Sequence, residues 1–160
     1  MAKQYSLGEI QSNTDRFKLF YLHCEHDLVI PTVDKLNSNG VRVIDIGKLL
    51  SLFISSLNDF EYLDSDVQDY LVKKILIPND PTLVDGSSDL VAVYNIGILM
   101  EPTLNLNVEH MLKEFSKSIP LIIIWEYIVI EDGLFYWSHD DKKSALDFSD
   151  IQIKKLNYAL

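Results

Sequence analysis

FKLFYLHCEHDLVIPTVDKLN, residues 17–37, is the stretch that decides the fold. Residues 17–22 are apolar and rich in aromatic side chains, a pattern typical of a buried β-strand. Residues 27–36 follow with helical spacing of apolar side chains and with Pro31 in the expected first turn, where proline is tolerated. The apolar residues 41–46 predict a second strand, so the stretch and its continuation predict one βαβ unit.

The loop between this strand and helix, residues 23–30, reads HCEHDLVI. A phosphate-binding loop at this place would read G-x-x-x-x-G-K-[ST], with glycines that bring backbone N–H groups to phosphate and a lysine that neutralises it. The loop has neither glycine nor lysine, and it adds two carboxylates, Glu25 and Asp27. The sequence therefore predicts that nucleotide is not turned over here.

Alternating strand and helix signals continue along the rest of the chain. Helices are expected from 45 or 47 to 57, from an N-cap at Ser65 to 75, and from an N-cap at 105 or 107 to 117. Strands are expected at 90–94 and 121–125, and a loop at 78–88. A hairpin of residues 127–130 and 134–137 is expected around Glu131-Asp132-Gly133. Residues 148–158 fit either a strand or a helix. The elements predict one domain over residues 1–160, a three-layer α/β fold with a mostly parallel sheet and a C-terminal antiparallel hairpin.

Composition limits the classes of partner. The formal charge is -10 with a pI near 4.7, and only Arg16 and Arg42 supply guanidinium groups. Nucleic-acid backbones require clustered cations, so direct DNA or RNA binding is not expected. The single cysteine, Cys24, suits a reducing compartment, and apolar runs such as residues 119–125 are too short to span a bilayer. With no export signal in its first residues, the protein is expected to be cytoplasmic.

Three longer stretches resemble a known family. GVRVIDIGKLLSLF (residues 40–53), DLVAVYNIGILMEPTL (89–104) and LIIIWEYIVIEDGLFYWSHDD (121–141) resemble, in order, segments of the small P-loop ATPase-like proteins of BREX-type phage-defence systems. The first looks like the second strand and following helix of that family, the second like its Walker B strand, and the third like its tryptophan-bearing strand and hairpin. The resemblance implies a P-loop NTPase-like fold and a place in an antiviral defence complex.

The residues at that family's nucleotide-binding positions differ from its pattern. Its Walker A loop has two glycines, a lysine and a hydroxyl residue, and the positions are here occupied by His23, Leu28, Val29 and Ile30. Its Walker B strand ends in an aspartate, but Tyr94 stands there, followed by Asn95, and a later acid falls at Gly97. Because phosphoryl transfer depends on these charges, catalysis should be lost. The resemblance then implies a degenerate nucleotide site without a cofactor, in a non-catalytic pseudo-ATPase that serves larger defence proteins as a scaffold or regulatory subunit.

The loop after the first expected strand contains residue types that bind metals or act as nucleophiles. Residues 23–26, HCEH, contain three kinds of metal ligand, but only His23 and His26 have the spacing of a ligand pair. We therefore expect no metal site, with a site completed by His110 or His139 as the alternative. A Cys24 nucleophile would lack an orienting third group in the sequence, so a partly buried thiol in a surface loop is the favoured interpretation.

Aromatic residues gather around the expected hairpin, at Trp125, Tyr127, Tyr136 and Trp137. Core packing and a protein-protein interface are the favoured interpretations of this cluster. Because aromatics beside acids suit an interface with a basic partner, these four residues are the expected partner-binding surface. The alternative function is an acidic immunity or anti-restriction protein that binds and inhibits a basic toxin or nuclease. A third interpretation retains enzymatic activity through a composite site to which a partner supplies the missing groups.

Overall fold

A computed structural model describes residues 4–76, 90–127, 129–130, 133–139, 142–151 and 153–156. The elements in chain order are β1 (Gln4–Tyr5), α1 (Leu7–Gln11), β2 (Leu19–His23), η1 (His26–Leu28), α2 (Val29–Ser38), β3 (Arg42–Asp45), α3 (Ile46–Ser56), α4 (Leu63–Leu76), β4 (Val91–Tyr94), η2 (Ile96–Met100), η3 (Pro102–Leu104), α5 (Val108–Ser118), β5 (Leu121–Trp125), β6 (Val129–Ile130), β7 (Leu134–His139), β8 (Lys142–Asp147), η4 (Ser149–Ile151) and β9 (Lys154–Leu156). The loop expected at 78–88 lies outside the described residues, as do Glu131 and Asp132 of the expected turn.

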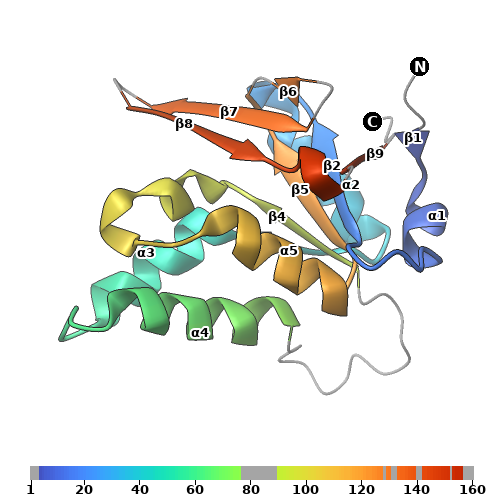
Figure 1. Cartoon of the computed structure of the whole chain (residues 1–160). Helices are drawn as coiled ribbons and strands as arrows, with labels where there is room; N and C mark the ends of the chain where they lie inside the picture. The colour runs from blue at the N-terminus through green and yellow to red at the C-terminus, as the bar shows by residue number, and fades with distance from the viewer. Residues whose placement is uncertain are drawn as a thin grey trace.

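Six strands form the main sheet in the order β1-β9-β2-β5-β4-β3 (Figure 1), and each neighbouring pair in it is parallel. β5 lies near its centre with all five residues of LIIIW buried, as the unbroken apolar run predicted. It pairs with β2 so that Leu19 lies opposite Leu121 and His23 opposite Trp125. The α/β class and the mostly parallel sheet are therefore confirmed.

β2 and β3 run parallel, but they are not neighbours. β5 and β4 lie between them, so the connection through α2 crosses two strands instead of forming the compact βαβ unit expected from the sequence. The difference follows from burial. The residues of β4 and β5 are apolar and almost all buried, which suits the middle of a sheet, whereas the RVID residues of β3 are mostly only partly buried and lie at the edge.

Helices cover both faces of the main sheet, and each face has its own apolar core. α2 packs Val29, Val33 and Leu36 against one face. The other face is covered by α3, α4, α5 and the second sheet, with buried side chains such as Leu50, Leu71, Leu112 and Phe135. Figure 1 shows α4 and α5 side by side on this face. Each fully buried Leu or Phe contributes about 1.5–3 kcal/mol relative to an exposed one, so these two cores dominate the fold's stability.

Two helices begin at caps that the sequence predicted. The Asp45 side chain accepts a hydrogen bond from the Lys48 N–H at 2.9 Å and begins α3. The Asn107 side chain accepts one from the His110 N–H at 3.1 Å and begins α5. Each cap satisfies one of the N–H groups that a helix N-terminus leaves without a partner.

α4 differs from its predicted start. The helix spans Leu63–Leu76, so Ser65, the expected N-cap, lies inside its first turn. Its other end is held by Arg42 of β3, whose guanidinium donates to the carbonyl oxygens of Lys74, at 2.5 Å, and Ile75. These contacts give partners to carbonyl groups that a helix C-terminus leaves unpaired and place a cation where the helix dipole favours one.

The antiparallel hairpin is confirmed, and it is part of a three-stranded sheet. β7 pairs with β6 on one side and with β8 on the other. The strand β8 was not predicted from the sequence. Of the ambiguous segment 148–158, the described part forms η4 and then β9, which enters the main sheet between β1 and β2. Phe135 and Phe148 belong to the apolar core, with ring centroids 5.6 Å apart, so the small sheet is anchored by packing.

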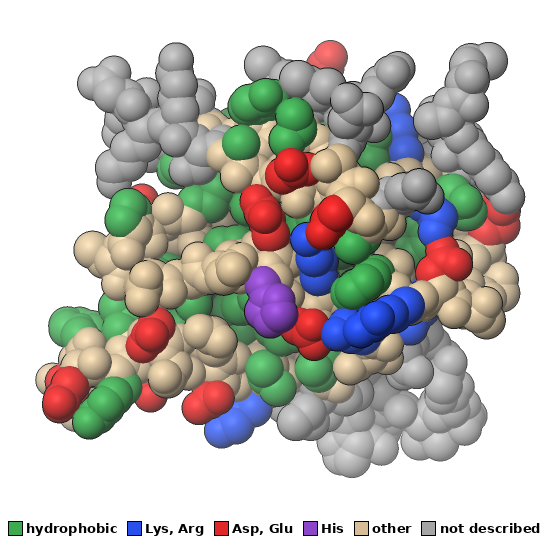
Figure 2. Space-filling model, in the orientation of Figure 1, with side chains coloured by type: hydrophobic (Ala, Val, Ile, Leu, Met, Phe, Trp, Pro, Cys, Tyr) green, Lys and Arg blue, Asp and Glu red, His purple; other side chains and the backbone are tan. Residues whose placement is uncertain are grey.

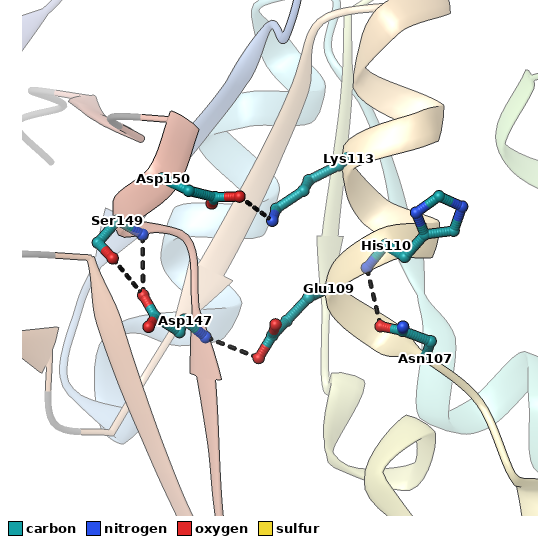
Figure 3. A network of polar contacts seen from close by, with 7 residues as sticks. All are labelled: Asn107, Glu109, His110, Lys113, Asp147, Ser149 and Asp150. Atoms are coloured by element: carbon teal, nitrogen blue, oxygen red, sulfur yellow. Dashed lines mark hydrogen bonds and ion pairs between the residues drawn. The ribbon is translucent and has the colours of Figure 1, made fainter.

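A polar network joins α5 to the end of β8 (Figure 3). Lys113 Nζ lies 2.7 Å from Asp150 Oδ2, and Glu109 Oε1 accepts the Asp147 N–H at 2.9 Å. The Asp147 carboxylate in turn accepts from the N–H and hydroxyl of Ser149, and these bonds hold its pKa below the ordinary value. The network fixes the turn between β8 and η4 against the helix.

The surface shows no basic stripe on the face drawn in Figure 2. Lys and Arg side chains there alternate with Asp and Glu around α5, instead of gathering into the continuous cationic surface that a nucleic-acid backbone requires. Within the described part of the chain, no helix is both long enough and apolar enough to cross a membrane.

Candidate functional site

The carboxyl ends of three neighbouring strands, β2, β5 and β4, meet at one edge of the main sheet. From this edge the chain leaves β2 toward α2 on one face, whereas it leaves β4 and β5 toward α5 and the second sheet on the other. Connections that diverge to opposite faces open a crevice, and in open α/β sheets ligands bind at such a point. We therefore take this edge as the candidate site.

A cavity of about 290 Å³ lies at this edge. It is lined by His26 of η1, by Val29 and Ile30 at the start of α2, by residues 94–97 at the end of β4 and just after it, by residues 124–127 at the end of β5, and by Trp137 of β7. Small-molecule sites typically occupy about 300–1,000 Å³, so this cavity suits a small group better than a whole nucleotide.

Three hydrogen bonds between described residues fasten the last residue of β2 and the loop after it to the end of β5. His26 Nδ1 lies 2.7 Å from Glu126 Oε2, and His23 Nε2 lies 2.6 Å from the carbonyl oxygen of Tyr127. The Cys24 N–H donates to the Trp125 carbonyl at 3.1 Å, and the Tyr127 ring lies nearly perpendicular to that of Trp125. These bonds use groups of the loop that a phosphate-binding loop would turn toward its ligand.

Asn95 is fixed by its neighbours in a left-handed conformation, with φ of 55°. Its side-chain amide donates to Asp45 Oδ1 at 3.0 Å, across the carboxyl ends of β4 and β3. A Cβ atom on Gly47 would lie 2.2 Å from Asn95 Nδ2, so only glycine fits beneath this amide. Asn95 thus has a structural role at the position that follows Tyr94, the last residue of β4.

Gly97 has a similar role on the other side of the cavity. A Cβ atom at this position would lie 2.5 Å from Trp137 Nε1 and 2.8 Å from its Cε2, so the indole packs directly on the glycine backbone. The position that carries a later acid in the resembling family is therefore covered by a side chain of the second sheet.

The pKa values of four ionisable groups at the cavity are raised by burial, by nearby carboxylates or by both. The pKa of His26 is raised by the hydrogen bond and the charge of Glu126, with a smaller effect of Asp27. Burial raises the pKa of Tyr94, and the Asp45 carboxylate, to which its hydroxyl donates, raises it further.

Two more groups follow the same direction. Burial raises the pKa of Tyr127, and the charge and hydrogen bond of Glu126 add to this, although a hydrogen bond from Trp137 acts against it. Burial likewise raises the pKa of the Cys24 thiol. A hydrogen bond with Thr32 lowers this pKa, and the charge of Glu126, the smallest of the three effects, raises it. In all four groups nearby carboxylates disfavour additional negative charge.

The structure brings together most of the residues expected at the degenerate nucleotide site. Val29, Ile30, Tyr94 and Asn95 line the cavity, and His23 bonds to the Tyr127 carbonyl beside it. Leu28 lies in η1 and is 41% exposed, and Ile30 is 57% exposed at the cavity's edge. At the two positions that the resemblance sets against the lysine and hydroxyl residue of a P-loop, this chain has a buried valine and an exposed isoleucine.

The four expected partner-binding aromatics separate into two groups. Trp125 and Trp137 are only 2% and 8% exposed, so their indoles belong to the core, and an exposed contact surface made of all four residues is corrected accordingly. Tyr127 and Tyr136 are 36% and 41% exposed and remain accessible. Among the described residues, Trp125 Nε1 is a buried polar atom without a hydrogen-bond partner, and its ring meets Phe135 and Tyr127 edge to face.

Glu126 is the site residue that sequence reasoning missed. Its side chain, 24% exposed, lines the cavity, pairs with His26 and accepts from Tyr127. No motif contains it. Its position directly after the predicted central strand was the available signal, because the carboxyl ends of parallel strands are where α/β folds bind ligands.

Metal-ligand side chains do not converge in the described part of the chain, where no three His, Cys, Asp or Glu residues lie close enough to hold one ion. His23 and His26 instead bond to the end of β5. His110 lies at the start of α5, where its N–H is bonded to the Asn107 side chain (Figure 3).

Comparison with known proteins gives little further identification. No protein-family model matches the chain, and no solved structure matches it. An uncharacterized response regulatory protein of Staphylococcus epidermidis is 30% identical over 94 residues, which cover 56% of this chain. The chain spans 38% of the length of that relative, which is too little to assign a family.

Proposed function

We propose that this chain is a non-catalytic, P-loop-like subunit that acts as a scaffold or regulator in a bacterial anti-phage defence complex. Residues 40–53, 89–104 and 121–141 resemble, in order, segments of the small ATPase-like proteins of BREX-type systems. This resemblance supports a similar fold and a similar biological system, whereas the chemistry of the site supports a binding role instead of ATP hydrolysis.

The observation that carries the proposal is the charge at the carboxyl edge of the sheet. A nucleotide site needs cations and free backbone N–H groups at the β2 to α2 loop. Here Glu126 lines the cavity, and none of the described lining residues is a lysine or arginine. The N–H groups of Cys24 and Leu28 are bonded within the chain, at 3.1 Å to Trp125 and 2.9 Å to Glu25. A polyphosphate at this edge would meet repulsion without compensating contacts.

A binding role fits the surface around the cavity. Leu28, Ile30 and Tyr127 are exposed at the edge of the site, and Tyr136 is exposed on β7. Apolar and aromatic side chains beside carboxylates are typical of the anchors of a protein interface that meets a basic partner. The loop, fastened to β5 through His23 and His26, presents them from a rigid base.

Affinity capture from the native host, analysed by mass spectrometry, tests the proposal. The tagged protein is expected to recover larger defence-system proteins, and Tyr136→Ser should reduce that recovery. Tyr62→Ser is the matched control, since Tyr62 is 64% exposed at the start of α4, away from the site. Capture of an unrelated set of proteins, or recovery unaffected by both substitutions, would contradict the proposed role of this surface.

The net charge of -10 favours a second candidate, an acidic immunity or anti-restriction protein that inhibits a basic toxin or nuclease. This candidate predicts recovery of one small basic protein in a one-to-one complex that dissociates as salt is raised. The same capture experiment, repeated at low and high salt, separates the two functions.

A further inference from the structure

We propose that the cavity at the carboxyl edge of β2, β5 and β4 binds the guanidinium group of a partner protein's arginine, with Glu126 as its anionic ligand and Tyr127 as its stacking surface. This inference rests on the proposed function, because it names the chemistry of the partner at the same site. It assigns to the cavity a cation in place of the anion that a P-loop binds.

The charge of the lining selects a cation. Glu126 contributes a carboxylate to the cavity wall, and no lysine or arginine is among the described residues that line it, so the lining is anionic when His26 is neutral. Asp45 lies behind Tyr94 and Asn95, whose polar groups it binds. Because water is partly excluded from a cavity, these carboxylates act more strongly there than on an open surface.

The pairing of Glu126 with His26 leaves room for this cation. The imidazole bonds Oε2, and the side chain of His26 is 84% exposed, so it lies at the entrance and does not fill the cavity. A carboxylate offers about four acceptor positions on its two oxygens, of which His26 and Tyr127 use two. A guanidinium can therefore bond Glu126 without displacing either.

Aromatic rings select a flat, weakly hydrated cation. Tyr94, Trp125, Tyr127 and Trp137 all line the cavity, and the rings of Trp125 and Tyr127 meet at 71° with centroids 5.6 Å apart. Ring faces carry partial negative charge and attract cations. Guanidinium stacks on a ring and bonds a carboxylate in the same plane, which a lysine ammonium, a compact and strongly hydrated charge, does less well.

The source of the cation is a protein because the rim of the cavity is apolar. Ile30 and Tyr127, which line the cavity, are 57% and 36% exposed, and Leu28, at the end of η1 just before the lining residue Val29, is 41% exposed. A free metabolite inside the cavity would leave these side chains in water. A polypeptide that inserts one arginine would cover them, as interface residues around a central anchor do.

The test uses the full chain and its two tryptophans, both of which line the cavity. Acetyl-Leu-Arg-Leu-amide is titrated while the indole N–H signals of Trp125 and Trp137 are followed by NMR. We expect saturable shifts, with binding about tenfold or more weaker for the peptide in which neutral citrulline replaces arginine. Glu126→Gln should weaken arginine binding similarly, whereas Glu61→Gln, an exposed acid before α4, should not.

Three results would overturn the inference: no saturable shift with the arginine peptide, equal binding of the citrulline peptide, or free arginine amide binding as tightly as the peptide. The last would assign the cavity to a small molecule. Tyr127→Leu gives an independent variant, expected to weaken binding without removing the carboxylate. If Mg-ATP shifts the same indole signals with saturation, the proposed function also fails. If neither Mg-ATP nor the arginine peptide shifts these signals, only the guanidinium inference is contradicted.

Discussion

His26 Nδ1 lies 2.7 Å from Glu126 Oε2 and joins the loop after β2 to the end of β5. The two residues are 100 positions apart in the chain. Their contact joins a base and an acid beside the cavity, where the carboxyl ends of β2 and β5 lie. It fastens the loop to the end of the central strand, and Glu126 supplies a carboxylate to the cavity wall.

The first prediction concerns the titration of His26. Its pKa is raised by the hydrogen bond and charge of Glu126, so Glu126→Gln should return it toward the ordinary histidine value. Because the folded-state pKa is the higher one, the pair's stabilisation is complete below the pKa of an unfolded histidine and is lost as pH rises through the folded value. A histidine NMR titration of both proteins measures the shift.

Asp27→Asn provides the matched control for this titration. The charge of Asp27 is the smallest of the causes that raise the pKa of His26, so the change should be smaller than that of Glu126→Gln. Equal titration of His26 in the native and Glu126→Gln proteins would show that the contact does not persist in solution.

The second prediction concerns Gly97. Replacement by alanine puts a Cβ atom 2.5 Å from Trp137 Nε1, so the buried indole must move, at a cost of about 1–3 kcal/mol in the free energy of unfolding. Gly8→Ala is the control, since a Cβ atom there meets nothing within 4 Å. Urea unfolding of the two variants compares them, and equal stabilities would contradict the packing of Trp137 on Gly97.

The third prediction separates packing from charge in the attachment of the second sheet. Phe135 is fully buried between Tyr21, Trp125 and Phe148, so Phe135→Ala should lower the free energy of unfolding by about 3–5 kcal/mol. Asp150→Asn, which removes the exposed partner of Lys113, should cost less than about 1 kcal/mol.

Chemical denaturation monitored by tryptophan fluorescence measures both changes, because Trp125 packs on Phe135. A larger loss for Asp150→Asn than for Phe135→Ala would mean that the polar network, and not the apolar core, holds the second sheet to α5.

Much of the main sheet could be predicted because its central strands are continuous apolar runs, which is the composition expected of buried strands. The runs LIIIW and VAVY are apolar on both faces and became β5 and β4, and the caps Asp45 and Asn107 begin the expected helices. β8 and β9 could not be predicted in this way. The sequences KKSALD and KKL lack the apolar alternation of a strand, and their pairing depends on neighbours that are distant in the chain.

The candidate site was predicted in part for the same reason. The strand ends Tyr94 and Trp125 could be placed at one edge from sequence, since parallel strands share their direction. The order of the sheet is a non-local property, so the sequence did not show that β5 would lie beside β2. Without that neighbour, Glu126 could not be connected to His26 or to the cavity.

The central proposal is that the carboxyl ends of β2, β5 and β4 form a negatively charged site that does not bind nucleotide. Isothermal titration of the purified chain with Mg-ATP tests it most directly. Repulsion from Glu126 and the absence of a lysine among the described lining residues predict no saturable heat up to about millimolar nucleotide, with or without magnesium. Tight, magnesium-dependent binding of ATP would contradict the account and restore a nucleotide site at His23.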